Sequence, residues 1–280
     1  MQARVPTLMD LTIPAYCEDG IWYPRASSTD TRARTVWSTA AEANPIRAAA
    51  ATGDENPFAK YPEWIRPHFA TKAGLLLDAG CGYGRVSIPL LESNPQLRCI
   101  GVDASPVMLR KFVQLATEHG VRDRVELFCG NIDVLPFTDG YFHCVLSCAV
   151  LLHIPKSEVS RIVAECGRVL NAGGTMVAAG SFPNVFNPEG VTNLRNNLQA
   201  AANGPVRAYR RGEVTRLFRG FSRVTVEAHQ MIVLPRSIGS IPLPCAGVAR
   251  NVNQYFTDHW MHTFRHSPLF VNHHDVIAVK

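Results

Sequence analysis

Short apolar segments alternate with amphipathic helical patterns between Leu75 and Gly180. The short segments have the length of buried strands, whereas the helical patterns repeat apolar residues every three or four positions. This alternation is typical of strand–helix–strand units that build a parallel sheet. We predict five strands in this region, at residues 75–78, 98–103, 125–129, 142–147 and 175–179.

Two helices within this region have clear boundaries. Ser105 and Pro106 provide an N-cap and a proline at the first helical position, so a helix is expected to begin there. The other helix precedes the fifth strand, and the turn at 171–174 ends it.

The rest of the chain departs from this rhythm. We expect residues 1–55, which are rich in Pro, Ala, Ser and Thr, to form an N-terminal cap or lid. Residues 56–181 form the predicted core, and residues 182–220 form a polar inserted segment. Residues 221–280 carry strands six and seven, with a helix near 246–264 between them.

The composition is that of a globular protein and excludes several classes. The chain has 280 residues, of which 46% are hydrophobic and 18% charged. No apolar run approaches the ~18 to 20 residues of a membrane span, and the first thirty residues lack the apolar segment of a signal peptide. The 8 cysteines include no CxxC pair. We therefore expect a cytoplasmic protein without disulfide bonds.

The net charge of +5 comes mainly from arginine, because lysine occurs only at positions 60, 72, 111, 156 and 280. One cluster has only Glu213 against it and comprises Arg207, Arg210, Arg211, Arg216, Arg219 and Arg223. Three interpretations stay open: a solvated helix face, a site for an anionic small molecule, and an RNA contact.

A glycine-rich turn, Asp78-Ala79-Gly80-Cys81-Gly82-Tyr83-Gly84, follows the first strand and opens a helix. Such a turn lets backbone N–H groups approach a ligand at the edge of the sheet. The dinucleotide fingerprint requires Gly or Ala at position 85, where this chain has Arg85. Asp78 would also repel a pyrophosphate. A positively charged ligand fits better, and S-adenosylmethionine (SAM) carries both an ammonium and a sulfonium group.

Polar residues follow the next two strands as well. Asp103 ends the second strand, where a carboxylate can accept both hydroxyls of a ribose. Asn131 and Ile132 follow the third strand, where an amide oxygen and an apolar side chain suit an adenine ring. Together with the glycine turn, these residues predict a site for a nucleoside ligand.

Residues 75 to about 180 resemble the SAM-binding core of class I methyltransferases. The segments that carry the resemblance are 75–84, 102–109, 131–137 and 167–174. The resemblance implies an α/β, Rossmann-like fold with a seven-stranded, mostly parallel sheet in the order 3-2-1-4-5-7-6 and helices on both faces. It also implies an antiparallel strand seven, which the terminal run 276–279 fits.

The resemblance further assigns roles to individual residues. The predicted cofactor-binding residues are Asp78, Gly80, Cys81, Gly82 and Gly84 at the methionine part, Asp103, Ala104 and Met108 near the ribose, Asn131 and Ile132 at the adenine, and Ser147 at the amino group. Asn131 departs from the Asp of many members, although its oxygen can still accept from the adenine amine. His143 replaces a common Asp, which we interpret as surface variation.

His153, just after the fourth strand, is the candidate general base, and the family commonly has a histidine here. An ordinary imidazole titrates near ~6.5 and can accept a proton at neutral pH. The other interpretation is that His153 only packs on the cofactor or orders its loop.

A second set of side chains shares one helix face, because offsets of 4, 7 and 11 return to the same side. It comprises Tyr255, His259, His262 and His266. Packing, an acceptor pocket and a metal site are all open for this set, but no cysteine or clear carboxylate completes a ligand set, so we expect no metal. Tyr16, Trp22 and Tyr23 are candidate lid residues. The candidate acceptor-pocket residues are Tyr23, Tyr255, His259 and His262.

The sequence therefore predicts a SAM-dependent methyltransferase acting on a small-molecule acceptor, such as a natural product, a quinone, a phenol or a lipid-like compound. The alternatives are an RNA methyltransferase and a SAM-binding protein without catalysis. Methylases of base amines carry an Asn- or Asp-Pro-Pro-aromatic tetrapeptide after strand four, whereas this chain has Ser147-Cys148-Ala149-Val150. A nucleic-acid partner is therefore not expected, while an anionic small acceptor stays open.

Overall fold

The computed structural model describes residues 10–25, 61–186, 207–228, 233–234, 237–238, 241–242, 244–264 and 271–280. These residues divide into two compact units. The first lies within residues 1–147 and 164–176 and includes Lys280, and the second lies within residues 148–163 and 177–279. Most of the predicted cap, including residues 26–55, falls outside the described residues.

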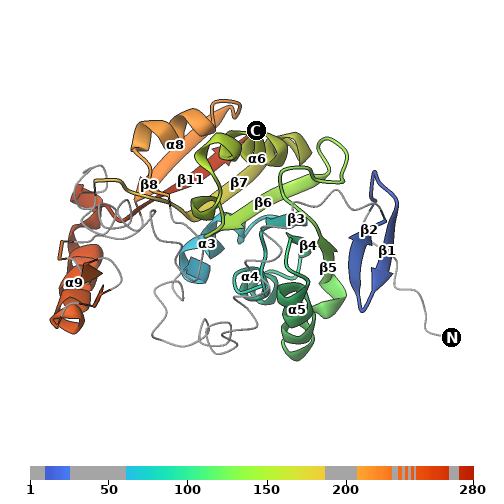
Figure 1. Cartoon of the computed structure of the whole chain (residues 1–280), viewed down its shortest axis with the longest axis horizontal. Helices are drawn as coiled ribbons and strands as arrows, with labels where there is room; N and C mark the ends of the chain where they lie inside the picture. Colours follow the sequence, from blue (N-terminus) through green and yellow to red (C-terminus); the bar gives the residue numbers. More distant parts are fainter. Residues whose placement is uncertain are drawn as a thin grey trace. The chain divides into compact units, whose positions relative to one another are not determined.

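The sheet of the first unit has the order β1-β2-β5-β4-β3-β6-β7 (Figure 1). Its strands are β1 (Ala15–Glu18), β2 (Ile21–Pro24), β3 (Gly74–Ala79), β4 (Leu97–Asp103), β5 (Val125–Cys129), β6 (Phe142–Cys148) and β7 (Leu170–Pro183). The printed pairs β2–β5, β5–β4, β4–β3 and β3–β6 are all parallel. β3 is central, and its Leu76, Leu77 and Ala79 are fully buried, as expected for a strand covered on both faces.

Helices alternate with these strands along the chain, and one face of each is apolar. They are α3 (Tyr61–Phe69), α4 (Ser87–Ser93), α5 (Pro106–Glu118) and α6 (Lys156–Val169), with 3-10 turns η2 (Arg122–Arg124) and η3 (Leu151–His153). α4 and α5 pack against β4 and β5 (Figure 1). The N-cap of α5 is as predicted, since the Ser105 hydroxyl accepts the N–H of Met108 at 3.3 Å and Pro106 opens the helix.

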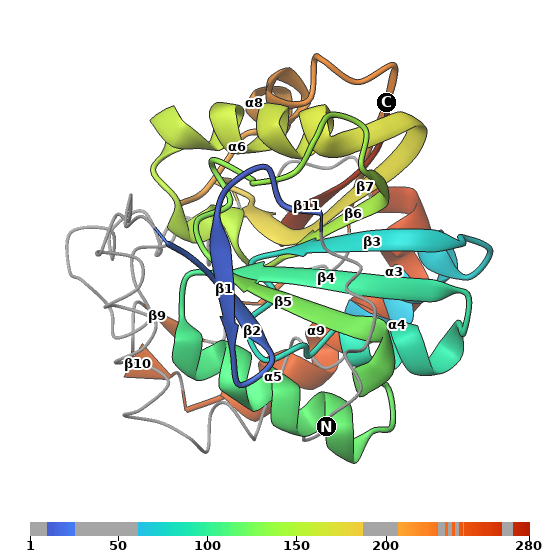
Figure 2. The ribbon, with the colours of Figure 1, turned by 90° about the vertical axis from the view of Figure 1, so that its right-hand side faces the viewer.

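The N-terminal hairpin corrects the expected strand count of seven to nine. β1 and β2 pair antiparallel, and β2 then pairs with β5 at the edge of the sheet (Figure 2). Asp19 and Gly20 form the two-residue turn, with φ values of 51° and 77°. Positive φ at both positions matches the twist of the flanking strands. The hairpin therefore covers the edge that β5 would otherwise expose.

The second unit contains the order β7-β11-β8, with β11 (His273–Val279) antiparallel to β8 (Arg223–Ala228). In the predicted numbering, β5, β4, β3, β6 and β7 are strands 3, 2, 1, 4 and 5, and β11 and β8 are strands 7 and 6. The observed order of these strands therefore confirms the predicted fold. The second unit also contains α8 (Arg211–Leu217), α9 (Ala246–Phe264) and the two-stranded sheet of β9 (Ser237–Ile238) and β10 (Ile241–Pro242). Among the described helices, none combines the length and the apolar character that crossing a membrane requires.

Candidate active site

The predicted polar residues lie at the ends of neighbouring strands in the first unit. Asp78 is the next-to-last residue of β3, Asp103 ends β4, Asn131 follows β5 and Ser147 lies near the end of β6. Because these strands are parallel neighbours, their carboxyl ends meet at one edge of the sheet. The structure therefore brings together the residues predicted to bind the cofactor.

The glycine turn is held against β4 by its own backbone. The N–H groups of Gly80 and Cys81 both donate to the carbonyl oxygen of Val102, at 2.8 and 3.1 Å. Gly82 has a φ of 53°, and a Cβ added to it would meet nothing within 4 Å. The backbone at this point therefore borders open space, as binding of a ligand against the glycine turn requires.

The Asp103 carboxylate connects this turn to the start of α5. Its Oδ2 accepts the N–H of Gly82 at 2.9 Å, and its Oδ1 accepts the N–H of Ser105 at 2.8 Å. Each carboxylate oxygen retains a further acceptor site for a hydroxyl. Burial raises the pKa of Asp103, although the two N–H groups act in the opposite direction. The geometry leaves this carboxylate able to receive a diol.

Asp78 is buried at the mouth of the turn. Its carboxylate accepts the hydroxyl hydrogen of Ser87, at the start of α4. The pKa of Asp78 is raised to about 7, mainly by burial and also by the nearby Asp103, while Ser87 and Arg85 act in the opposite direction. A cation placed beside this carboxyl would favour its ionised form. The site therefore suits a positively charged ligand.

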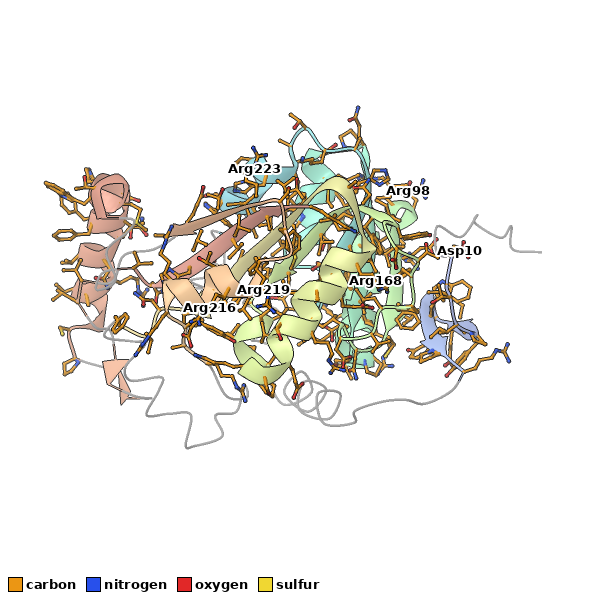
Figure 3. The ribbon with its side chains drawn as sticks, turned by 90° about the horizontal axis from the view of Figure 1, so that it is seen from above. Asp10, Arg98, Arg168, Arg216, Arg219 and Arg223 are labelled. Atoms are coloured by element: carbon orange, nitrogen blue, oxygen red, sulfur yellow. The ribbon has the colours of Figure 1, made fainter. Side chains whose placement is uncertain are left out.

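The loop after β5 is fixed by a salt-bridged pair on α6. Arg168 donates to the carbonyl oxygens of Phe137 and Leu135 at 2.8 and 3.0 Å and pairs with Glu165 at 2.8 Å (Figure 3). Glu165 in turn accepts the N–H of Leu135 at 2.7 Å. These contacts stabilise the loop that begins with the half-buried Asn131 and the buried Ile132.

The remaining predicted cofactor residues occupy the same edge. Ser147 is buried, and its hydroxyl donates to the carbonyl oxygen of Ala79 at 3.1 Å. Cys81 is also buried, and burial raises the pKa of its thiol well above the ordinary value. Ala104 and Met108 are half-buried around the first turn of α5. Because its thiol is buried and keeps its proton, Cys81 acts as a packed neutral side chain.

His153 ends the short turn η3 in the second unit. The Nη1 group of Arg207 donates to the carbonyl oxygen of His153 at 2.7 Å. The backbone N–H of Arg207 donates to the carbonyl oxygen of Leu152 at 2.8 Å. One member of the arginine cluster therefore anchors the loop that carries the candidate base.

The other arginines of the cluster differ in their surroundings. Arg210 lies 5.6 Å from the ring centre of Phe186, whereas Arg216 on α8, Arg219 just after it and Arg223 at the start of β8 are exposed (Figure 3). The cluster is therefore not one uniform surface, and the solvated interpretation fits its exposed members best.

The candidate acceptor residues are distributed over both units. Tyr255 and His259 lie on α9 in the second unit, where their rings stack with centres 4.3 Å apart and both side chains are exposed. Tyr23 lies on β2 in the first unit. The side chain of His262 and the whole of His266 lie outside the described residues. Within the described residues, no group of three or more His, Cys, Asp or Glu could hold a metal ion.

Residues 76–174 match the family model described as a methyltransferase domain. The chain therefore carries a methyltransferase domain over these residues, which are about a third of its length. It is 36% identical over 111 residues to demethylmenaquinone methyltransferase of Lactiplantibacillus plantarum, covering 39% of this chain and 46% of that protein. It is 28% identical over 102 residues to ajmaline N-methyltransferase of Rauvolfia serpentina, covering 36% of this chain and 34% of that protein. The chain thus spans less than half the length of these relatives.

A solved structure supports the fold over a greater length than the sequence relatives do. Geranyl diphosphate C-methyltransferase from Streptomyces coelicolor A3(2), in complex with Mg2+, geranyl-S-thiolodiphosphate and S-adenosyl-L-homocysteine, is similar with a TM-score of 0.55 and 15% identity. The match covers 91% of this chain and 98% of that chain. At this identity the likeness shows the methyltransferase fold alone.

Sequence reasoning missed several residues that shape the candidate site. Ser87 was not singled out, although a hydroxyl nine positions after Asp78, at the start of the next helix, is a local signal. The Asp19-Gly20 pair between short apolar runs is a hairpin signal that also went unused. The partners of Arg168 and Arg207 are distant in sequence, so no local pattern could identify them.

Proposed function

We propose that this methyltransferase binds SAM at the edge formed by β3, β4 and β5 and transfers its methyl group to a small-molecule acceptor. The observation that carries the proposal is the contact between Asp103 and Gly82. The Asp103 carboxylate accepts the N–H of Gly82 at 2.9 Å, and a Cβ added to Gly82 would meet no atom within 4 Å. That combination provides a diol acceptor and room for a ligand in the same place.

The residues around this point suit the parts of SAM. Asp78 would hold the methionine ammonium, with the turn from Gly80 to Gly84 and the end of β6 at Ser147 around it. Asp103 would accept the ribose hydroxyls, with Ala104 and Met108 beside them. Asn131 would accept from the adenine amine, with Ile132 as its apolar backing. The burial of Asp78 supports this assignment, because a bound ammonium would offset the burial that raises the pKa of this carboxyl to about 7 and would favour its ionised form.

The chain's own residues have two tasks in the transfer. SAM, when bound, would supply a methyl group that the positive charge on its sulfur makes ready for transfer, with S-adenosylhomocysteine as the leaving group. The protein must align the acceptor with that methyl group and remove the acceptor's proton. We assign the second task to His153, whose loop is held by the 2.7 Å contact from Arg207 to its carbonyl oxygen.

The acceptor is a small molecule in this proposal. The names of the relatives support that class, since ajmaline, demethylmenaquinone and geranyl diphosphate are small compounds. An anionic acceptor is the finer form of the proposal, with the arginines around α8 as its partners. We also propose the cytoplasm as the compartment in which the enzyme acts.

Calorimetry and a labelling experiment test the proposal. We expect SAM and S-adenosylhomocysteine to bind to the purified protein and NAD not to bind. The protein is then incubated with isotope-labelled SAM and a cell extract, and mass spectrometry identifies the labelled product, which we expect to be a small molecule. Failure to bind SAM would contradict the cofactor assignment. Labelled RNA would support the RNA methyltransferase instead, and binding without any labelled product would support the non-catalytic protein.

A further inference from the structure

The N-terminal hairpin is attached to the first unit at three places. At its turn, the carbonyl oxygen of Gly20 accepts from Nη2 of Arg122 at 3.2 Å. Along its length, β2 pairs with β5 (Figure 2). Before β1, the N–H of Thr12 donates to the carbonyl oxygen of Pro136 at 3.0 Å, and the N–H of Asp10 donates to the Tyr141 hydroxyl at 3.0 Å. The hairpin is therefore an integral part of the sheet, and it lies at the β5 edge, next to the loop 131–137.

The register of β2 places Tyr23 at the carboxyl end of β5. Ile21 pairs with Leu127 and Trp22 with Phe128, so the next residue, Tyr23, lies beside Cys129. Paired residues of parallel strands point to the same face of a sheet, and Tyr23 therefore shares a face with Cys129. Burial raises the pKa of Tyr23, the Cys129 thiol raises it further, and Arg110 lowers it, in agreement with this position.

Cys129 connects Tyr23 to the proposed ribose position. The Cys129 thiol donates to the carbonyl oxygen of Ala104 at 3.8 Å, and Ala104 follows Asp103 directly. Neighbouring strands are about 4.8 Å apart, so Tyr23 on β2 stands roughly 10 Å across the sheet edge from Asp103 on β4. A base that extended outward from a ribose at Asp103 would therefore cross the end of β5 and come close to Tyr23.

A second aromatic ring supports Tyr23 from the outer strand. Tyr16 on β1 pairs with Tyr23, and their rings stack with centres 5.4 Å apart and planes at 21°. Tyr16 is 43% exposed, whereas Tyr23 is half-buried. The outer ring thus limits the orientations of the inner one, and purine bases bind well to aromatic surfaces that are fixed in this way.

We propose that Tyr23 forms the outer wall of the adenine subsite and contacts the base of the bound cofactor with its ring. The inference rests on the proposed function, since it deepens the description of the same site. It changes the expectation that Tyr23 lines the acceptor pocket. The hairpin then has a binding role, because it brings to the adenine a side chain that lies outside residues 76–174.

Calorimetry with S-adenosylhomocysteine tests the inference on the full chain. We expect Tyr23→Ala to raise the Kd by roughly 5- to 100-fold, the range typical of losing one base–aromatic contact. Tyr23→Phe keeps the ring and should stay within about 2-fold of the unmodified protein. Cys17→Ala, an exposed change on the same hairpin, is the matched control and should also leave the Kd unchanged.

Hydrogen exchange at residues 15–24 and 125–129 shows whether Tyr23→Ala leaves the hairpin docked, and Tyr23→Leu supplies a variant that retains the apolar bulk. A docked hairpin with a raised Kd for both S-adenosylhomocysteine and adenosine supports the inference. An unchanged Kd in Tyr23→Ala overturns it, and so does an effect confined to the KM of the acceptor. If the unmodified protein fails to bind S-adenosylhomocysteine, the proposed function itself is contradicted.

Discussion

The backbone N–H of Gly82 donates a hydrogen bond of 2.9 Å to Oδ2 of Asp103. Gly82 follows β3, whereas Asp103 is the last residue of the neighbouring strand β4, so the contact joins the glycine turn to the strand beside it. Oδ1 of the same carboxylate accepts the N–H of Ser105, so one side chain holds two loops at the proposed ribose position.

Asp103→Asn should weaken SAM binding strongly. The amide has one acceptor oxygen in place of two, so the contacts to Gly82 and Ser105 and those to a ribose cannot all be kept. We expect the Kd for SAM to rise by about 10- to 100-fold, from the loss of charge-assisted hydrogen bonds. Calorimetry measures this effect, with the exposed Asp123→Asn as the control. Equal affinities in the two variants would contradict the ribose assignment.

Two glycines of the turn should respond differently to alanine. Gly84 has a φ of 80°, and an added Cβ would clash with the buried ring of Phe112, so we expect Gly84→Ala to lower the free energy of unfolding by about 2 to 4 kcal/mol. Gly82→Ala meets no protein atom within 4 Å and should cost only about 1 kcal/mol, but its methyl group would occupy ligand space.

Urea denaturation and SAM calorimetry on both glycine variants separate the two effects. A folded Gly82→Ala variant that binds SAM normally would show that the open space at this turn is not used by the ligand.

The buried carboxyls make stability depend on pH. Burial raises the pKa of both Asp78 and Asp275 to about 7, whereas an unfolded Asp titrates near ~3.9. Between about pH 4 and pH 7 the folded protein keeps protons that the unfolded chain has released. The free energy of unfolding therefore falls as the pH rises through this window and levels off above it.

Asp78→Asn should remove one of these two contributions. We expect the fall in unfolding free energy between pH 4 and pH 7 to be smaller in the variant by roughly 3 to 4 kcal/mol, measured by urea denaturation of the ligand-free protein. The same fall in both proteins would show that Asp78 is ionised in the free state. SAM should bind more weakly to the variant at any pH, because the carboxylate that receives the ammonium is gone.

Arg168→Ala should destabilise the loop after β5. The change removes hydrogen bonds to the carbonyl oxygens of Leu135 and Phe137 and leaves the Glu165 carboxylate, whose side chain is 16% exposed, without its partner. We expect a loss of about 2 to 3 kcal/mol of unfolding free energy and a several-fold weaker affinity for SAM. The exposed Arg98→Ala, which loses one 3.3 Å contact, should stay within about 0.5 kcal/mol (Figure 3). Similar stabilities of the two variants would contradict the anchoring role.

His153→Ala tests the assignment of the general base. Removing a base typically lowers kcat by about 10²- to 10⁴-fold, and we expect a loss in this range with the Kd for SAM unchanged. Turnover of the labelled acceptor measures it, with His119→Ala, an exposed histidine paired with Glu92 at 2.8 Å, as the control. An unchanged kcat would leave His153 only the role of packing or ordering its loop.

Most of the core could be predicted because its signals are local. The apolar run before Asp78 and the cap at Ser105 act on neighbouring residues. β3 lies within one residue of its predicted bounds, and α5 begins at the predicted Pro106. The hairpin was missed because four residues per strand carry almost no periodicity. Its pairing with β5 connects residues about a hundred positions apart, which a pattern along the chain does not express.

The sequence by itself determined the α/β fold class and the edge at which the acidic residues gather, since parallel strands end together whatever their side chains do. The strand order of the core was implied by the resemblance to class I methyltransferases, and the structure confirms it. Only the tertiary structure decided which partners those residues have. It placed Gly82 on Asp103, Arg168 on the loop after β5, Arg207 on the carbonyl oxygen of His153 and Tyr23 beside Cys129. Such contacts depend on the packing of distant segments, because a hydrogen bond requires atoms within about 3 Å and the chain brings these atoms together only when it folds.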